Sequence, residues 1–293
     1  MRKNIKSIPV NRLEKTESGI VVEKFENHSR LPLQEAAHSH RHDHHIFLLV
    51  EEGEIHLEVD FEMQFLQAGS VTYIHPSQIH RIVDHNRSSF YLLGITSENM
   101  GEEYIRLLEH TLFPVKPIDL GEEIKAVIFE SVRLCQKIYK RKAEKIYSTL
   151  IKDQSNAFIG LYVSQYLQEK QIPDNPNRYE VLTKAFRESL EQNFTRIKSA
   201  SEYANVLNVS ASYLRESIRK TTGLSISEHI QNRNILETKR LLYHTDKSVK
   251  EIAIELGYED YSYFSRFFKR SVGITALEFR NQVRKNNRTN ILS

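Results

Sequence analysis

The spacing of apolar residues changes along this chain of 293 residues. Up to about residue 96, apolar and polar residues alternate in short runs, which is the period of β-strands. From residue 101 onward, apolar residues recur every three to four positions, which is the period of helices. A polar stretch with two prolines, QIPDNPNR, interrupts the helical pattern and is typical of a linker. The pattern predicts a barrel domain over residues 1–100, a helical region over 101–170, a linker over 171–178 and a helical domain over 179–293.

The expected strands of the first segment are short and closely spaced. Ile46–Val50 and Glu54–Asp60 flank Glu51-Glu52-Gly53, which favours a turn. Further strands are expected at Met63–Leu66, Ser70–Ile74, Ile79–Val83 and Phe90–Ile95. Many short strands joined by tight turns indicate an all-β sandwich or barrel.

The last segment contains one helix-turn-helix pattern twice. The first copy, SASEYANVLNVSASYLRESIRKTTG, spans residues 199–223, and the second, SVKEIAIELGYEDYSYFSRFFKRSVG, spans residues 248–273. Equivalent positions lie 49 residues apart before the turn and 50 after it, because the second turn holds one extra residue. Two copies in register, separated by one helical stretch, indicate a protein that reads DNA with two heads.

Both copies carry the same local folding signals. Each begins with a capping box, Ser199-x-x-Glu202 or Ser248-x-x-Glu251, in which serine and glutamate satisfy free N–H groups of the first turn. Asn208 and Gly257 tolerate the left-handed backbone that a sharp helix exit needs. The pattern also predicts N-caps at Ser210 and Asp260 and buried stripes at Leu214, Ile218, Phe264, Phe267 and Phe268.

Charge is distributed unequally between the two parts of the chain. Residues 178–293 carry 20 lysines and arginines against 13 acidic residues, a net charge of +7, whereas residues 1–177 carry 21 against 25. A basic domain attracts nucleic acid. An ordinary helical bundle with a solvated charged face is the alternative, but the duplication and the turn residues favour DNA binding.

Three further features of the sequence indicate the cellular compartment of the protein. No run of about 18 apolar residues is present, so no membrane span is expected. The stretch MRKNIKSIPVNRLEK has basic residues without an apolar segment behind them, unlike a secretion signal. The single cysteine, Cys135, cannot form an internal disulfide and is expected to be a small buried residue. We therefore expect a cytoplasmic protein that associates with the nucleoid when bound to DNA.

Residues 179–282 resemble the DNA-binding domain of AraC/XylS-type bacterial transcription regulators. The stretch SVKEIAIELGYEDYSYFSRFFKRSVGITALEFR resembles the signature of that family almost from end to end. It departs at Ala276, where proline is common, and Thr238 stands in the linking helix where a smaller residue is usual. The resemblance implies seven helices, two helix-turn-helix units joined by a long helix near Ser225–Tyr243, and promoter DNA and RNA polymerase as partners.

The resemblance also implies which side chains meet DNA. Base contacts are expected from the two reading helices, where an arginine can bind guanine in a bidentate way. Phosphate contacts are expected from basic residues toward the end of each reading helix. The expected base-contacting residues are Ser212, Arg215, Glu216, Tyr261, Ser262 and Arg266, and the expected phosphate-contacting residues are Arg219, Lys220, Lys269 and Arg270. Ser265 is a further position that is expected to be exposed and to meet DNA.

The segments HSHRHDHHIFLLVEEGEIHLEV and AGSVTYIHPSQIHRI resemble the cupin-type sensor domain of the same regulators. That domain is a small barrel which, in regulatory members, binds an organic effector, often a sugar. The resemblance therefore implies a small-molecule, sugar-like effector, and two tyrosines would stack on a sugar ring if they face inward. The expected effector-binding residues are His40, His42, His44, Tyr73, His80 and Tyr91.

The histidines leave two other interpretations open. His40, His42 and His80 have the residue type and order of a metal site, or they serve only the structure. Metal-binding cupins carry a glutamate where this chain has Ile46, so neither a metal nor another cofactor is expected. The alternatives are a metal-binding cupin enzyme fused to a DNA-binding tail and a regulator whose vestigial barrel serves only assembly.

The helical region over residues 101–170 has two amphipathic stripes. Such stripes either pack on the barrel or form a dimer contact, and we expect them to do both and to produce a homodimer. The whole sequence thus predicts a two-domain α+β fold, with a cupin-like β-barrel and following helices and then an all-α double helix-turn-helix domain. The expected function is transcription regulation, as an activator without enzymatic activity.

Overall fold

The computed structural model describes residues 10–13, 18–26, 39–110, 116–141, 146–169 and 177–289. The chain divides into two compact units, one within residues 9–173 and one within residues 174–293. Most of the expected linker, residues 171–176, lies outside the described residues. None of the described helices is long and apolar enough to cross a membrane.

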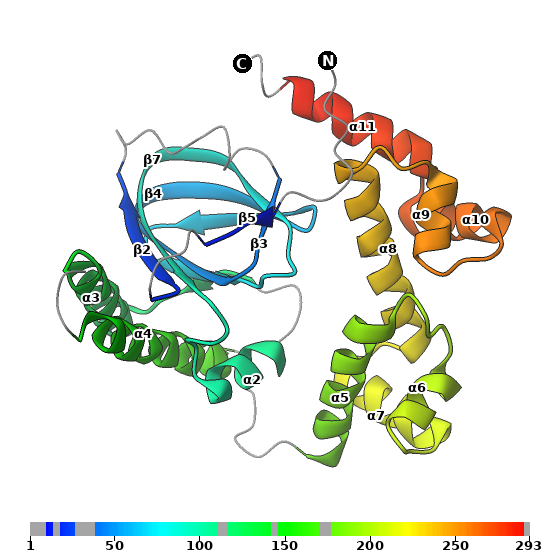
Figure 1. The fold of residues 1–293 in the computed structure, drawn as a ribbon, viewed down its shortest axis with the longest axis horizontal. Coiled ribbons are helices and arrows are strands. Elements are labelled where there is room, and N and C mark those ends of the chain that lie inside the picture. Colours follow the sequence, from blue (N-terminus) through cyan, green and yellow to red (C-terminus); the bar gives the residue numbers. More distant parts are fainter. Residues whose placement is uncertain are drawn as a thin grey trace. The chain divides into compact units, whose positions relative to one another are not determined.

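The first unit is built on one sheet that curls over on itself (Figure 1). Its strands run in the order β2-β7-β4-β6-β8, with β5 paired to the second half of β4, and a separate parallel pair joins β1 to β3. We call the curled sheet the barrel. The strands are β1 Val10–Asn11, β2 Ile20–Phe25, β3 Arg41–His42, β4 His45–Val59, β5 Glu62–Gln67, β6 Ser70–Ile74, β7 His80–Ile95 and β8 Ile118–Asp119.

Two pairs of expected strands are single long strands. The expected strands near residues 79–83 and 90–95 both belong to β7, and the expected turn at residues 51–53 lies inside β4. The turn prediction was wrong because these residues form β-bulges, where the pairing of β4 with β7 shifts register without ending the strand. Gly53 supplies the positive φ of 72° there. The bulges allow the first half of β4 to pair with β6 and its second half with β5.

The pleat of the strands separates two apolar cores. In the first half of β4, Ile46 and Leu48 face an inner core enclosed by the sheet, and Phe47 and Leu49 face an outer core. The bulges reverse this parity, so that Ile55 in the second half returns to the inner core. Because the side chains of a strand alternate between faces, every neighbouring residue of β6 and β7 is assigned to one core by its register with β4.

Helices close the outer core of the first unit. They are α2 Glu102–His110, α3 Glu122–Tyr139 and α4 Tyr147–Glu169. The ring of Phe129 on α3 lies 6.3 Å from that of Tyr91, and the ring of Phe158 on α4 lies 5.8 Å from that of Phe47. Cys135 on α3 is fully buried in the same core, as expected from the sequence.

The described part of the second unit contains seven helices, as the resemblance implied. The long helix α8 runs between α5–α7 at one end and α9–α11 at the other (Figure 1). Its limits agree with the expected linking helix to within one residue. The helices are α5 Arg178–Asn193, α6 Ala200–Val206, α7 Ala211–Thr222, α8 Ile226–His244, α9 Val249–Glu255, α10 Tyr261–Val272 and α11 Ala276–Thr289.

The local signals of both helix-turn-helix copies are confirmed. The capping boxes of Ser199 and Ser248 are both formed, and α7 and α10 are capped by the side chains of Ser210 and Asp260. Asn208 has the expected left-handed backbone, with φ 54°. The expected stripes are buried, namely Leu214, Ile218, Phe264, Phe267 and Phe268.

Two glycines of the second unit share a left-handed backbone but differ in how closely other atoms approach them. Gly223 and Gly257 have φ of 75° and 77°, but a Cβ would meet nothing within 4 Å at Gly223 and would collide with the carbonyl oxygen of Thr195 at Gly257. We predict that Gly223→Ala lowers the free energy of unfolding by about 1 kcal/mol through backbone strain. Gly257→Ala should cost at least about 2 kcal/mol, because strain and collision add.

Urea unfolding of both variants and the wild type, followed by far-UV circular dichroism, measures these differences. Equal losses of stability in the two variants would show that the approach of Thr195 imposes no constraint of its own.

Candidate nucleic-acid interface and barrel site

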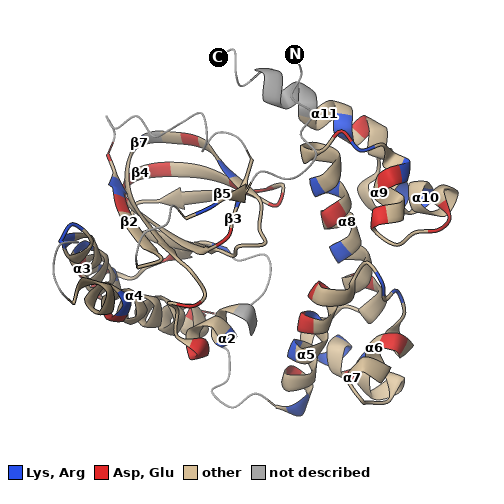
Figure 2. Cartoon of the chain, viewed as in Figure 1, with Lys and Arg blue, Asp and Glu red and all other residues tan. Residues whose placement is uncertain are grey.

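The two reading helices present their expected side chains to solvent. On α7, Arg215 and Arg219 are exposed, while the other face is anchored in the core by Leu214 and Ile218. On α10 all the expected DNA-contacting residues are exposed except Ser265, which is half-buried. Figure 2 shows basic and acidic residues interspersed over the helices of this unit. Each helix therefore has a polar face exposed to solvent and an opposite face buried in the core. The individual DNA contacts stay predictions.

The first reading helix is tied to α5 by a polar cluster that the sequence analysis missed. The carboxylate of Glu216 accepts a hydrogen bond from Lys220 at 2.7 Å and one from the hydroxyl of Tyr179 at 3.3 Å. These contacts, with the ion pair first, lower the pKa of Glu216. Arg178 stacks over the ring of Tyr213, with 5.5 Å from its guanidinium carbon to the ring centroid. Glu216 and Lys220 must therefore give up these contacts within the protein in order to contact DNA.

The second reading helix packs against the preceding turn through a group of aromatic rings. The rings of Tyr258, Tyr263 and Phe267 lie nearly parallel, with centroids 5.8 to 6.4 Å apart. Phe267 is buried, whereas Tyr263 is 50% exposed on the face of α10 that also carries Ser262 and Arg266. Tyr263 was not among the expected DNA contacts. The expected contacts on this helix came from the family resemblance, and the sequence pattern identified only its buried residues.

Four histidines gather at one end of the inner core. His40 and His80 form a backbone bridge with hydrogen bonds of 3.1 and 2.9 Å, and His80 pairs in register with Val59 of the inner core. The Nε2 atoms of His40 and His42 are 3.0 Å apart, and one ring nitrogen each of His40, His42 and His80 lies within 4.8 Å of the others. His44 adjoins them, with its ring centroid 4.6 Å from that of His42. The structure thus brings together all four histidines expected from the sequence.

His42 and His80 are held in the neutral form. Burial, with repulsion by neighbouring histidines, lowers the pKa of His42 to about 3, and the same causes lower the pKa of His80 well below its usual value. Among the described residues, Nδ1 of His42 and Nδ1 of His80 are buried without a hydrogen-bond partner. Buried polar atoms normally have partners, so these two nitrogens are candidates for contacts that the described residues do not supply.

The cluster also fits a transition-metal ion in its donor set. A metal–nitrogen distance of about 2.0–2.1 Å places neighbouring ligand nitrogens roughly 2.9–3.4 Å apart, a range that includes the separation of the His40 and His42 nitrogens. Ile46 takes the position where metal-binding cupins have glutamate, and its side chain is buried in the inner core. The chain therefore supplies three imidazoles there and no carboxylate from that position.

The two expected effector-binding tyrosines lie on the wrong face of the sheet. Tyr73 and Tyr91 both belong to the outer core, while His40, His42 and His80 adjoin the inner one. Tyr91 packs against α3 under Lys24, and the hydroxyl of Tyr73 contacts Nδ1 of another histidine, His45, at 2.7 Å. The expectation that they stack on a sugar beside the histidines was wrong, because strand parity directs them against the helices.

His45 is the buried polar residue that the sequence analysis missed. Its side chain is enclosed in the outer core, and Nε2 contacts the hydroxyl of Ser97 at 3.1 Å. Burial, followed by the charges of His75 and His44, lowers the pKa of His45 to about 3. Its position beside His44 in sequence suggests the same site, but His44 lies in the bend before β4 and contacts Asp43, whereas His45 begins β4 and contacts Tyr73.

Comparison with known proteins agrees with both units. The family model of a helix-turn-helix domain matches residues 203–282, and that of a cupin domain matches residues 27–93. The HTH-type transcriptional activator RhaR of Enterobacter sp. (strain 638) is 32% identical over 114 residues, which span 38% of this chain and 40% of that protein. RhaR of Mannheimia succiniciproducens is 24% identical over 277 residues, 91% of this chain and 93% of that protein. A solved structure, the C-terminal domain of AraT, a response regulator from Geobacillus stearothermophilus, is 26% identical, covering 36% of this chain and 88% of that one with a TM-score of 0.34.

These matches define a DNA-binding helix-turn-helix protein with an N-terminal cupin domain. The cupin and helix-turn-helix domains, in this order, are those expected from the resemblance to AraC/XylS-type transcription regulators, and the chain is similar to RhaR over most of its length. The two-domain α+β fold expected from the sequence is confirmed by the same matches and by the order of strands and helices.

The buried His45 predicts how the stability of the barrel depends on pH. A histidine whose pKa is lower in the folded than in the unfolded state stabilises the fold above pH 6.5 and loses that stabilisation as pH falls toward 3. From pH 7 to pH 5, His45 should therefore remove about 2 kcal/mol from the free energy of unfolding. His45→Gln should show a fall that is smaller by this amount.

Urea unfolding of the full chain at pH 7 and pH 5, followed by near-UV circular dichroism of the tyrosines, measures both falls. The other histidines contribute equally to the two proteins, so the difference isolates His45. The same fall in both proteins would show that the imidazole is solvated.

Proposed function

We propose that this transcription regulator is an activator controlled by a small, hydroxyl-bearing effector that binds at the histidine cluster of the barrel. The observation that carries the proposal is the pair of buried, unpartnered Nδ1 atoms of His42 and His80, counted among the described residues, at one end of an apolar core. Neutral imidazoles exchange hydrogen bonds with hydroxyl groups without the cost of burying a charge. The effector residues we retain are His40, His42, His44 and His80.

We further propose that α7 and α10 enter successive major grooves on one face of promoter DNA, roughly 34 Å apart. Their exposed outer faces differ in sequence, so that one protomer would read an asymmetric site. Arg215 and Arg266 are exposed near the middle of each helix, where bidentate contacts with guanine are feasible. The basic residues of the last turns, such as Lys269, would hold phosphates and fix the register.

Homodimerisation through α3 completes the proposal. Val127 and Leu134 are 44% and 45% exposed and lie seven residues apart, which places them on one face of that helix. A second copy would cover this apolar face, while the opposite face of α3 packs on the barrel. An activator also needs a contact with RNA polymerase, and the role of the RhaR relatives as transcriptional activators supports this partner.

A second candidate function is metal sensing through the same cluster. It is favoured by the 3.0 Å separation of the His40 and His42 nitrogens, with His80 as the third donor. A bound ion would act as a Lewis acid and template for a ligand, and the three imidazoles would hold it through neutral nitrogens. Since both candidates use the same residues, one experiment with two kinds of ligand separates them.

Two variants of the second reading helix test sequence recognition. Arg266→Ala should weaken binding to the preferred DNA sequence by about tenfold or more and hardly affect binding to random DNA, because a base contact is lost. Lys269→Ala should weaken both about equally, because a phosphate contact carries no sequence information. Fluorescence anisotropy, with sequences obtained by selection from random duplex DNA, measures the four affinities.

The salt dependence of wild-type binding is the control, and it should be steep. Equal losses on both DNAs for Arg266→Ala would reassign this arginine to the backbone of DNA.

A thermal-shift screen tests the barrel site. The wild-type full chain is heated with a panel of monosaccharides and, separately, with zinc or nickel chloride, since a ligand at 100 times its dissociation constant adds about 2.7 kcal/mol of stability. The stabilising compound should lose its effect on His80→Gln and keep it on Tyr91→Phe, whose ring lies on the other face of the sheet.

Stabilisation by a sugar supports the effector proposal, and stabilisation by the metal alone supports the second candidate. Stabilisation that survives in His80→Gln would contradict both, because the ligand would then bind away from the histidine cluster. No stabilisation by any ligand would also contradict both and would favour a barrel that serves only assembly.

A further inference from the structure

Lys198 lies where the two helix-turn-helix units of the second domain meet. It belongs to the loop between α5 and α6, and its Nζ donates three hydrogen bonds. The acceptors are the carbonyl of Phe194 at 2.6 Å, the side-chain oxygen of Asn234 at 2.8 Å and the carbonyl of Leu256 at 2.7 Å. The ammonium group also lies 4.6 Å from the ring centroid of Tyr258. These partners belong to the first helix-turn-helix unit, to α8 and to the second helix-turn-helix unit.

The chemistry of the three acceptors explains why a lysine suits this place. Phe194 and Leu256 are the C-caps of α5 and α9, so their carbonyl groups lack partners within their own helices and carry the negative end of the helix dipole. An ammonium group has three donors and a positive charge, and it satisfies both helix ends at once. Burial lowers the pKa of Lys198 to about 8, which leaves it largely charged at neutral pH.

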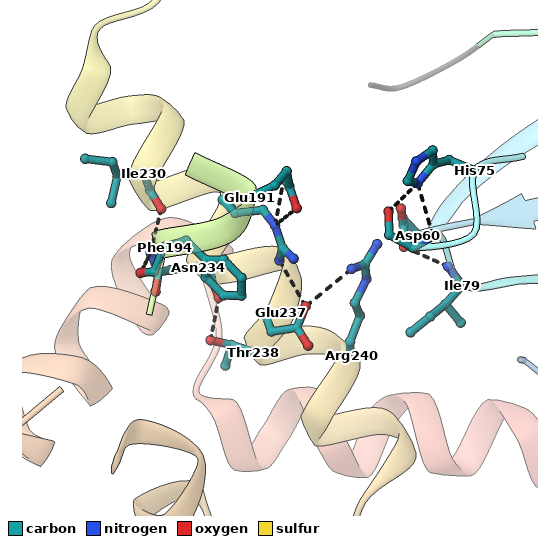
Figure 3. A network of polar contacts seen from close by, with 12 residues as sticks. Asp60, His75, Ile79, Glu191, Phe194, Ile230, Asn234, Glu237, Thr238 and Arg240 are labelled. Carbon is teal, nitrogen blue, oxygen red and sulfur yellow. Dashed lines mark hydrogen bonds and ion pairs between the residues drawn. The ribbon is translucent and has the colours of Figure 1, made fainter. Parts of the chain in front are cut away.

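The other contacts at this junction are rigid. Asn234 is fully buried on α8 and also donates to the carbonyl of Phe194 and to that of Ile230, as Figure 3 shows. The backbone at Thr195, in the loop that carries Lys198, lies against Gly257 of the second turn so closely that a Cβ would not fit. The two helix-turn-helix units therefore touch directly at this point, in addition to being joined along α8.

The separation of the reading helices depends on this junction. α7 follows the loop of Lys198 through α6, and α10 follows Leu256 through the turn at Gly257. A small rotation at the junction is amplified at the far reading helices, which must match two major grooves at a fixed distance. We propose that Lys198 is a positioning residue that sets the spacing between the two base sequences that one protomer recognises.

This inference rests on the proposed reading of DNA by both helices, and selection from random DNA tests the two separately. The full-length wild type, Lys198→Met and Lys184→Met are each used to select from a library of random 40-base-pair duplexes. Methionine keeps the apolar stem and removes the donors. Lys184→Met removes the same charge from a half-buried position on α5, where its partner is Glu188.

The wild type and Lys184→Met should recover two short motifs at one fixed separation. Lys198→Met should recover the same two motifs at several separations. It should also bind the preferred wild-type sequence about tenfold more weakly, yet bind a duplex carrying one motif as the wild type does. A protein that is only less stable would lose affinity for both duplexes and keep the fixed separation.

Thermal unfolding establishes the temperature at which each variant is folded, and Lys198→Gln, which keeps two donors, replaces the methionine variant if that one does not fold. One sharp separation and unchanged affinity in the folded variant would overturn the proposal for Lys198. Recovery of a single motif by the wild type would instead overturn the reading by two helices, and the inference with it.

Discussion

The alternation of side chains along β4 and its partners is the constraint on which the first unit depends. Both faces of the first half of β4 are buried, one inside the curled sheet and one beneath α3 and α4. Each residue of β6 and β7 inherits a face from its register with β4, and a shift by one residue would exchange the faces. This rule places His80 at the inner core and Tyr73 against the helices, and so limits which side chains can share a ligand.

Two chemically different histidine environments result from the same rule. His42 and His80 keep ring nitrogens without partners among the described residues, and those nitrogens are suited to a ligand. His45, on the other face, has both nitrogens engaged by hydroxyl groups and forms part of the packing. Low pKa values are common to both environments, because burial is their shared cause, so a low pKa by itself does not identify the binding site.

The second unit depends on a different kind of interaction, the satisfaction of helix ends. Serine and glutamate cap α6 and α9 in the same way, and the ammonium of Lys198 satisfies the carbonyl ends of α5 and α9 together. The first kind of contact is local and is repeated in each copy. The second kind of contact joins residues 58 positions apart and connects one helix-turn-helix copy to the other.

The sequence by itself determined the elements whose signals are local. Capping boxes, left-handed turn residues and buried stripes at Leu214 and Phe264 are written within one or two helical turns, and the structure has them all. Only the tertiary structure decided that residues 51–53 bend a strand instead of ending it, and that Tyr73 and Tyr91 face the helices. It alone brought Lys198 to Leu256. These features depend on strand register and on contacts between distant residues, and the spacing of residues along a chain does not encode which distant partner will be met.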